Sequence, residues 1–337
     1  MRATFNKGYP PMSGVQNIIV SKEENGQRLD RWLGKKGVPF FLVHKFCRSG
    51  QLRIDGKRAK ADVRLVEGQN VRVPPYTPKD STPHKGPVKL SEKDRAYIKS
   101  LVIYDDGQII ALNKPSGLAT QGGTNMKQHV DRLLVGLADK DGIKPHLVHR
   151  LDKDTSGILL LARNAEMARA LGRSFKAKDV EKTYIGITMG VPELMQGEIK
   201  APLHKTETGR DKDRVVVSDE GKYAHTMFSV LETMRKQAAL VAFQPMTGRT
   251  HQIRVHSAYM GCPLIGDFKY GYDPELFAQI NLKKRLHLHA YRLRLPHPAN
   301  RKKILDLQAP IPDDFVANMK ELGFDHSIKA DNIQFEI

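Results

Sequence analysis

A polar segment of nine residues, 149–157, carries the side chains of this chain that are best suited to chemistry. It contains the carboxylate of Asp152, with the cations Arg150 and Lys153 close to it in sequence. An apolar run, 158–162, follows directly and is typical of a buried strand, so the polar segment is expected to be a loop held by core elements. A carboxylate fixed beside cations stays ionised and can act as a nucleophile or a base. The alternative is an ordinary capped turn, whose aspartate and serine side chains bind their own backbone.

Two further segments have residues that suit a binding cleft. The β-rich run 182–187 contains Tyr184, whose ring is most simply part of the core when the sequence is taken alone. The run 247–256 has a glycine turn that leads into a polar helix start, which places Arg249 at a helix N-terminus.

Two histidines, His287 and His289, fall on one face of a predicted strand, and a metal pair is conceivable there. No third ligand occurs at a suitable spacing, and the only cysteines, Cys47 and Cys262, have no paired spacing. A metal site and disulfides are therefore not expected, and this cysteine usage indicates a reducing, cytoplasmic compartment.

The composition indicates a polyanionic partner. The 337 residues carry a net charge of +18, and the pI is about 9.8. Such a balance is typical of proteins that bind nucleic acid or an anionic membrane. No apolar run approaches the roughly 18 residues of a membrane span, which favours nucleic acid over a membrane. The length allows one or two domains, each with a real core.

Half of the net charge lies in the first 80 residues, where a small domain is predicted. Apolar residues at helical spacing indicate helices in 29–33 and 42–47, and Gly50 suits the end of the second. The pair Asp55-Gly56 is a hairpin signal between short strands. Basic residues of the second helix and the hairpin form a basic cluster suited to phosphate contacts, although a solvated surface explains any single one of them. The cluster consists of Lys45, Arg48, Arg53, Lys57, Arg58 and Lys60.

Residues 76–98 are rich in proline and predict an extended linker, after which a second domain begins. Its pattern is mostly β, with a strand–turn–strand unit at 102–112. A helix is predicted at 165–175, with Asn164 as its cap. The charge-dense stretch 205–222 is predicted to be a protruding β-hairpin that touches the nucleic acid, with a solvated loop as the alternative.

These motifs resemble those of the RluA-type pseudouridine synthases. The run His-Arg-Leu-Asp-Lys-Asp-Thr-Ser-Gly at 149–157 is similar to the family signature over nine residues without a gap. Lys-Pro-x-Gly at 114–117, Lys-x-Tyr at 182–184 and Thr-Gly-Arg-Thr-His-Gln-Ile-Arg-Val-His at 247–256 are similar to further family motifs. Residues 18–75 resemble an S-four-type RNA-binding domain, so the chain looks most like the RluC-like members, which act on large-subunit ribosomal RNA.

The resemblance implies an α+β fold whose catalytic domain has one extended, mostly antiparallel mixed β-sheet with a cleft across its middle. The implied reaction is the isomerisation of uridine to pseudouridine in RNA. It has no redox or hydrolytic step, so neither a cofactor nor a metal is expected, and the enzyme is predicted to be a monomer. The predicted parts are a flexible tail (1–17), the RNA-binding domain (18–75), the linker (76–98) and the catalytic domain (99–337).

The resemblance also assigns roles to individual residues. Asp152 is expected to stabilise the positive charge that develops on the sugar when the glycosidic bond breaks. Whether it adds to the sugar, adds to the base or removes a sugar proton is left open. Tyr184 is expected to stack on the target base, and Arg249 to pair with Asp152 and keep it ionised. Arg150 is expected to fill the gap that the flipped uridine leaves in the RNA. Whether Arg254 supports the site or faces the RNA is left open.

Two other functions are considered. A non-catalytic ribosome-binding or assembly factor on the same scaffold is disfavoured because Asp152, Tyr184 and Arg249 are all present. An RNA N-glycosidase would need a general acid to activate water, and Asp154 is only a weak candidate for it.

Overall fold

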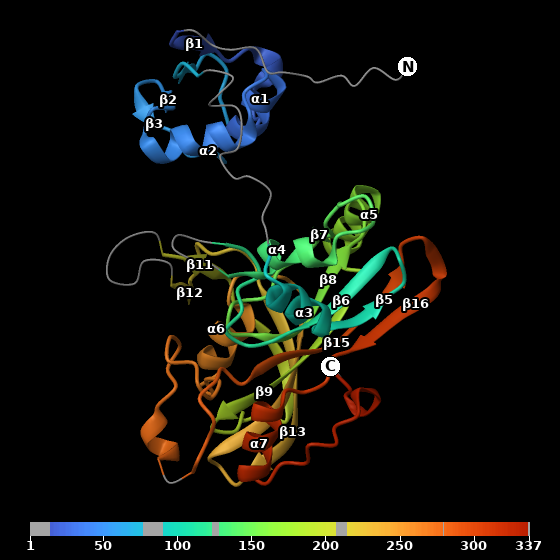
Figure 1. The fold of residues 1–337 in the computed structure, drawn as a ribbon. Helices are drawn as coiled ribbons and strands as arrows, with labels where there is room; N and C mark the ends of the chain where they lie inside the picture. The colour runs from blue at the N-terminus through green and yellow to red at the C-terminus, as the bar shows by residue number, and fades with distance from the viewer. Residues whose placement is uncertain (1–13, 77–89, 123–127, 207–213, 279, 336–337) are drawn as a thin grey trace. The chain divides into compact units, whose positions relative to one another are not determined.

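The computed structural model of the chain describes residues 14–76, 90–122, 128–206, 214–278 and 280–335. It contains two compact units, residues 1–88 and 89–337 (Figure 1). Within the described ranges, no helix is long and apolar enough to cross a membrane.

The first unit has the predicted helix–helix–hairpin order. Its sheet runs in the order β1-β4-β2-β3, and the two helices share a core with it. The second helix ends where Gly50 adopts a left-handed φ of 71°. The hairpin turn has φ of 49° at Asp55 and 77° at Gly56, and two positive values in a row identify a type I′ turn. The elements are β1 (Gln16–Ile19), η1 (Lys22–Glu24), α1 (Leu29–Lys35), α2 (Phe40–Ser49), β2 (Arg53–Ile54), β3 (Lys57–Arg58) and β4 (Asn70–Val73).

The boundaries of the predicted tail and linker need correction. The tail was predicted to extend to residue 17, but β1 begins at Gln16 and pairs with β4, while residues 1–13 lie outside the described part. At the other end of the unit, Tyr76 was assigned to the linker. Its ring is buried in the first core, and its hydroxyl donates to the carbonyl of Gly37 (3.2 Å).

The linker prediction is also wrong at its C-terminal end, because a helix, α3 (Glu92–Ser100), starts the second unit. Its N-cap, Ser91, accepts a hydrogen bond from the backbone N–H of Asp94, and Ile98 is fully buried. A serine followed three residues later by an acid is a helix-start signal, and the proline content of the preceding residues masked it. The proline-rich residues 77–89 lie outside the described part.

The second unit is built around one large sheet, which confirms the predicted α+β fold. The strands follow in the order β10-β13-β14-β9-β15-β8-β6-β5, with β16 also paired to β15 and β7 to β8. In the described sheet, the pairing of β8 with β15 is parallel and the others are antiparallel. The strands are β5 (Val102–Asp105), β6 (Ile109–Lys114), β7 (His146–Leu147), β8 (Ser156–Ala162), β9 (Glu181–Met189), β10 (Gln196–Lys200), β13 (His225–Met234), β14 (Ala238–Pro245), β15 (Leu288–His297) and β16 (Asn300–Gln308).

Helices cover both faces of this sheet. Alternate residues of a strand point to opposite faces. Ile185 and Ile187 of β9 therefore pack with Phe315 of α7, while Tyr184 lies on the other face in a cluster with Ile253 of α6. The remaining elements of the unit are α4 (Val130–Leu133), η2 (Leu134–Leu137), α5 (Ala165–Ala177), α6 (Gln252–Tyr259), η3 (Pro274–Phe277), α7 (Asp313–Glu321) and η4 (Ala330–Asn332).

Two local predictions in this unit can be compared directly with the structure. The Asn164 side chain accepts a hydrogen bond from the backbone N–H of Met167 (2.8 Å), so it caps α5 as predicted. In the predicted hairpin at 205–222, β11 (Leu203–Lys205) and β12 (Val215–Val217) pair antiparallel. Residues 207–213 between them lie outside the described part.

Gly157 occupies the parallel junction of β8 with β15 and leaves no room for a side chain. Its φ is 110°, and a Cβ there would lie 2.2 Å from the backbone oxygen of Ala290. Gly157→Ala is expected to reduce the free energy of unfolding by about 2–5 kcal/mol, because the backbone strain of a positive φ and the overlap of the new Cβ with Ala290 add. Urea denaturation measures the change. Gly107→Ala is the matched control, since Gly107 has a φ of 81° and a Cβ at that position would meet nothing within 4 Å; equal losses would contradict a role for the overlap.

Candidate active site

Asp152 lies in a loop between β7 and β8 whose backbone is held from the segment that follows β6. The Thr120 hydroxyl donates to the carbonyl of Leu151 (2.7 Å) on one side of the carboxylate. On the other side, the Ser116 hydroxyl donates to the carbonyl of Asp154 (2.7 Å). The segment with the Lys-Pro-x-Gly motif therefore fixes the loop that presents Asp152.

Lys114 adds a buried contact to the same loop. Its Nζ donates to three backbone carbonyls, those of Pro115 (2.9 Å), Leu118 (2.8 Å) and Lys153 (3.0 Å). Burial lowers the pKa of Lys114 to about 7, and the nearby carboxylates oppose that effect. Three acceptors need three N–H groups, which only the protonated amine has, so the hydrogen bonds assign the ammonium form. Lys114 thus places a positive charge behind the loop.

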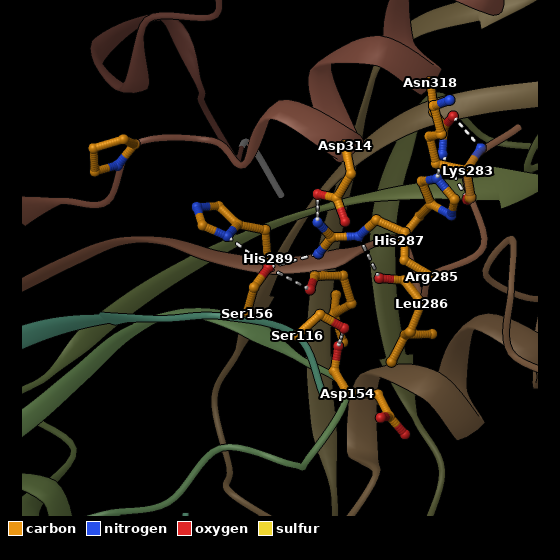
Figure 2. A network of polar contacts seen from close by, with 12 residues as sticks. Ser116, Asp154, Ser156, Lys283, Arg285, Leu286, His287, His289, Asp314 and Asn318 are labelled. Carbon is orange, nitrogen blue, oxygen red and sulfur yellow. Dashed lines mark hydrogen bonds and ion pairs between the residues drawn. The ribbon is translucent and has the colours of Figure 1, made fainter. Parts of the chain in front are cut away.

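The C-terminal end of the loop is anchored by a polar network at the start of β15. Figure 2 shows Arg285 between Ser156 and Asp314. Its Nη2 donates to the Ser156 hydroxyl (2.7 Å), which lies 2.9 Å from Nδ1 of His289. Nε2 of His289 faces the carbonyl of Ala309 (3.3 Å) and so carries the hydrogen. Nδ1 therefore accepts the serine proton.

Both ring nitrogens of His287 and of His289, the two histidines considered as a metal pair, contact other protein groups, and both rings are neutral. Nδ1 of His287 faces the carbonyl of Ile265 (2.9 Å), and its Nε2 faces the side-chain amide of Asn318 (2.6 Å; Figure 2). Burial lowers the pKa of His287 to about 4 and that of His289 to about 3. In the described ranges, no three His, Cys, Asp or Glu side chains gather as metal ligands would.

A cleft of about 520 Å³ lies beside this loop, on the face of the sheet that carries Tyr184. Its volume is within the range of sites that hold small molecules. The structure brings four of the predicted site residues to this one cleft: Asp152, Tyr184, Arg150 and Arg249 all line it. Its other walls come from the C-terminal part of α5, from β14 and from the start of α6.

The carboxylate of Asp152 is largely withdrawn from water, with its side chain 21% exposed. Burial raises the pKa of Asp152 above its usual value. The positive charges of Arg254, Arg150 and Lys114 oppose this, and the negative charge of Asp267 adds to it. The result is a desolvated carboxylate among three cations. Sequence analysis expected Arg150, Lys153 and Arg249 beside Asp152; Arg150 is one of the three cations found, and Arg254 and Lys114 are the other two.

Arg254, the third residue of α6, is the arginine with the strongest electrostatic effect on Asp152. It is buried, and it donates two hydrogen bonds to Asp267, from Nε and from Nη2, both of 2.7 Å. Asp267 is itself only 1% exposed. A two-bond arginine–carboxylate pair fixes the guanidinium plane, so the positive charge near Asp152 has a defined position.

The predicted ion pair between Arg249 and Asp152 is wrong: among the described residues, no contact joins them. Arg249 is exposed, and its Nε donates to the carbonyl of Tyr223 (3.0 Å). The helix begins later than the glycine turn suggested, at Gln252, whose side chain accepts the Arg249 backbone N–H (3.0 Å). Arg249 therefore precedes the helix at the rim of the cleft, and the arginine inside the helix takes the buried position.

Tyr184 presents its ring to the cleft from β9. Burial raises the pKa of its hydroxyl, and the negative charge of Asp152 raises it further, so the phenol stays protonated. Its hydroxyl has no hydrogen-bond partner among the described residues, which leaves it available to a ligand.

His149 fixes the entry to the loop, directly before Arg150. Its Nε2 accepts the backbone N–H of Leu160 (2.8 Å), and its ring stacks on Phe175 with centroids 4.7 Å apart. Burial lowers the pKa of His149 to about 3, so the ring is neutral and structural. Arg150, by contrast, is exposed at the cleft.

The basic cluster of the first unit lies on the last turns of α2 and on the β2–β3 hairpin, and its predicted RNA-binding residues are exposed. Helix and hairpin meet at Gly50: a Cβ there would lie 2.2 Å from Nε of Arg58. Arg53 donates from the hairpin to the carbonyl of Gly56 (3.1 Å). The exposed residues are Lys45, Arg48, Arg53, Lys57 and Arg58.

Comparisons with known proteins show the family of the chain. Residues 108–259 match the family model for RNA pseudouridylate synthase. The chain is 38% identical over 303 residues to the ribosomal large subunit pseudouridine synthase C of Vibrio vulnificus, which covers 88% of this chain and 93% of that protein. It is 34% identical over 313 residues to the protein of the same name from Escherichia coli O157:H7, covering 91% and 97%.

A solved structure, that of the human RNA pseudouridylate synthase domain containing 4, superposes with a TM-score of 0.58 at 29% identity. The superposition covers 68% of this chain and 97% of the human one. Because these relatives are matched over nearly their whole length, the chain belongs to the RluA-type family of RNA pseudouridine synthases.

Proposed function

We propose that this enzyme isomerises uridine to pseudouridine in large-subunit ribosomal RNA, with Asp152 as the catalytic group. The observation that carries the proposal is the cleft itself, where one desolvated carboxylate lies among three cations and beside an available tyrosine ring. The relatives named for the large ribosomal subunit support the choice of RNA.

The reaction exchanges one bond to the base for another. The C1′–N1 bond breaks, the base turns, and a C1′–C5 bond forms; C5 loses a proton and N1 gains one, so the product is an isomer of the substrate. Breaking the first bond develops positive charge on the sugar. The carboxylate of Asp152, held in a water-poor cleft, stabilises that charge.

The other cleft residues hold the flipped nucleotide. Tyr184 offers a ring face on which the uracil stacks and a protonated hydroxyl that donates to it. Arg150, exposed at the cleft, fills the gap in the RNA, because extrusion of a base costs a few kcal/mol that a replacement contact offsets. Arg249, exposed at the rim, contacts the RNA backbone instead of Asp152.

Base-specific labelling tests the proposal. Large-subunit ribosomal RNA transcribed without modification is incubated with the protein, treated with carbodiimide, and read by primer extension. Pseudouridine at defined positions is the expected result. Release of free uracil would show an N-glycosidase, and binding without conversion would show an assembly factor.

The basic cluster should account for part of the salt dependence of RNA binding. Replacing Lys45, Arg48 and Arg53 together by glutamine should weaken affinity and reduce the slope of log K against log salt by about 2–3, because fewer counterions are released. Filter binding between low and high salt measures the slope. Glutamine at Lys22 and Arg31, exposed in the same unit, is the control; a slope that falls equally in both variants would contradict a specific role for the cluster.

A cytoplasmic location and a monomeric enzyme stay predictions from the sequence. Light scattering after size-exclusion chromatography measures the molar mass, and therefore the oligomeric state, directly.

A further inference from the structure

His251 lies beside Asp152 and has a backbone conformation that histidine rarely adopts. It precedes α6 with φ of 54° and ψ of 21°, in the left-handed region. A non-glycine residue is strained there and persists only where the surroundings demand it, which often occurs at functional sites. The strained backbone directs the ring into the cleft, where Nε2 lies 3.9 Å from Oδ2 of Asp152.

Tyr270 determines which nitrogen of this ring carries the proton. Its hydroxyl lies 2.6 Å from Nδ1 of His251 and accepts the backbone N–H of Val215 (3.2 Å). Burial raises the pKa of Tyr270, so the hydroxyl keeps its proton. Because its oxygen already accepts the Val215 N–H, we assign Nδ1 of His251 as the acceptor of the hydroxyl hydrogen. A neutral imidazole whose Nδ1 accepts must carry its hydrogen on Nε2. The N–H of His251 is therefore on the side of Asp152.

The charges around the ring keep it neutral. Burial and the nearby cations together lower the pKa of His251 to about 4, while Asp267 opposes them. At neutral pH the ring is thus a neutral donor next to a carboxylate. The charged groups that face the two side chains are Arg254 on α6, Asp267 and Lys269 before η3, Arg150 on the catalytic loop and Lys114 behind it.

We propose that His251 is a positioning residue for Asp152: Tyr270 holds its imidazole N–H toward the carboxylate, which orients Asp152 and keeps it ionised for the flipped uridine. The inference rests on the catalytic role proposed above for Asp152. The separation of 3.9 Å is longer than a hydrogen bond, and it shortens when the bound nucleotide displaces water, as catalytic contacts commonly do.

The same contacts connect the carboxylate to a segment predicted to touch RNA. Val215 is the first residue of β12, at the base of the β11–β12 hairpin. Its backbone N–H donates to the hydroxyl of Tyr270, this hydroxyl contacts the ring of His251, and the ring faces Asp152. Displacement of this hairpin by RNA would therefore change the position of the imidazole at the catalytic carboxylate.

A glycine substitution separates a positioning role from a structural one. Glycine adopts the left-handed region without strain, so His251→Gly should fold with an unchanged or higher Tm. Its single-turnover rate should fall about 10- to 100-fold, since small misplacements at a reacting centre have effects of this size. Release of tritium from C5 of uridine in the transcribed RNA measures the rate. The acidic limb of the pH–rate profile should move to higher pH, because the carboxylate has lost a donor.

Two further variants complete the experiment. His251→Gln places an amide N–H near the position of Nε2 and should recover most of the rate and the original acidic limb. Arg235→Gly is the matched control, because Arg235 has a φ of 49° and lies exposed outside the residues that line the cleft. Like His251→Gly, it should have an unchanged or higher Tm, but its single-turnover rate and pH–rate profile should equal those of the wild type.

The outcomes distinguish the inference from the function on which it rests. If wild type releases no tritium, the proposed function fails. If wild type is active and His251→Gly matches it in rate and pH profile, the positioning role is wrong. A lower Tm with no recovery by glutamine would also overturn it, in favour of a structural role. The imidazole ¹⁵N spectrum of the wild-type protein should show the proton on Nε2, and a proton on Nδ1 would contradict the assignment.

Discussion

Replacing Asp152 by asparagine is expected to leave RNA binding within a few-fold of wild type and to abolish detectable pseudouridine formation. Asparagine keeps the shape of the side chain and removes its charge. The charge that develops on the sugar then meets a neutral amide in a cleft with little water, and the loss should exceed about 10³-fold. Carbodiimide labelling of the RNA measures conversion, and filter binding measures affinity.

Asp154→Asn is the matched control for this substitution. Asp154 lies two residues further along the same loop, is exposed, and contributes its backbone carbonyl, rather than its carboxylate, to the contact with Ser116. Its rate should stay within a few-fold of wild type. Turnover near the wild-type rate in Asp152→Asn would remove Asp152 as the catalytic group, and loss of activity in Asp154→Asn alone would revive the glycosidase alternative.

Arg254→Met is expected to have the second large effect, on stability and catalysis together. It leaves the carboxylate of Asp267 buried without its partner, which typically costs about 3–5 kcal/mol in the free energy of unfolding. It also removes the strongest of the opposing charges near Asp152, so the pKa of Asp152 rises further. A group that must be ionised then needs a higher pH, and the acidic limb of the pH–rate profile moves upward.

The double variant Arg254→Met, Asp267→Asn separates the two effects. Neutralising the orphaned carboxylate should recover much of the stability, measured by denaturant unfolding, without recovering the rate. Recovery of both would mean that Arg254 acts on the fold alone. Arg249→Ala supplies the comparison from the rim: it should weaken RNA affinity and leave the acidic limb in place. An upward shift there would reinstate Arg249 as the counter-ion.

The features that were predicted correctly depend on local chemistry. Asn164 before an apolar helical pattern caps α5, and Asp55-Gly56 forms the hairpin turn, because both signals act within a few residues of the backbone. The apolar run after residue 157 forms a central strand, β8, because a run of apolar side chains on both faces is stable only where both faces are buried. The cleft was predicted in a different way, from the resemblance of three motifs to those of the family, and residues of all three motifs line it.

The cation beside Asp152 could not be predicted from the sequence, because it depends on the residue at which α6 starts and on the side chain that pairs with the arginine in the folded protein. The helix starts at Gln252, three residues later than predicted, and this shift places Arg254 inside the cleft wall in place of Arg249. The start is fixed by the side chain of Gln252, which binds the turn before the helix. The partner that holds Arg254, Asp267, is thirteen residues away, and nothing in the spacing of the two residues predicts that they pair. Periodicity also missed α3, whose single fully buried residue, Ile98, leaves almost no apolar stripe to detect.

The anchor of the catalytic loop also has a consequence for the order in which the enzyme is made. Ser156 takes its partners Arg285 and His289 from positions 129 and 133 residues later in the chain. During synthesis from the N-terminus, the basic first unit can fold early, whereas Ser156 at the end of the Asp152 loop lacks these two partners until the start of β15 has left the ribosome. A nascent chain should thus acquire RNA affinity before it acquires activity, and a product truncated ahead of residue 285 would compete for RNA without modifying it.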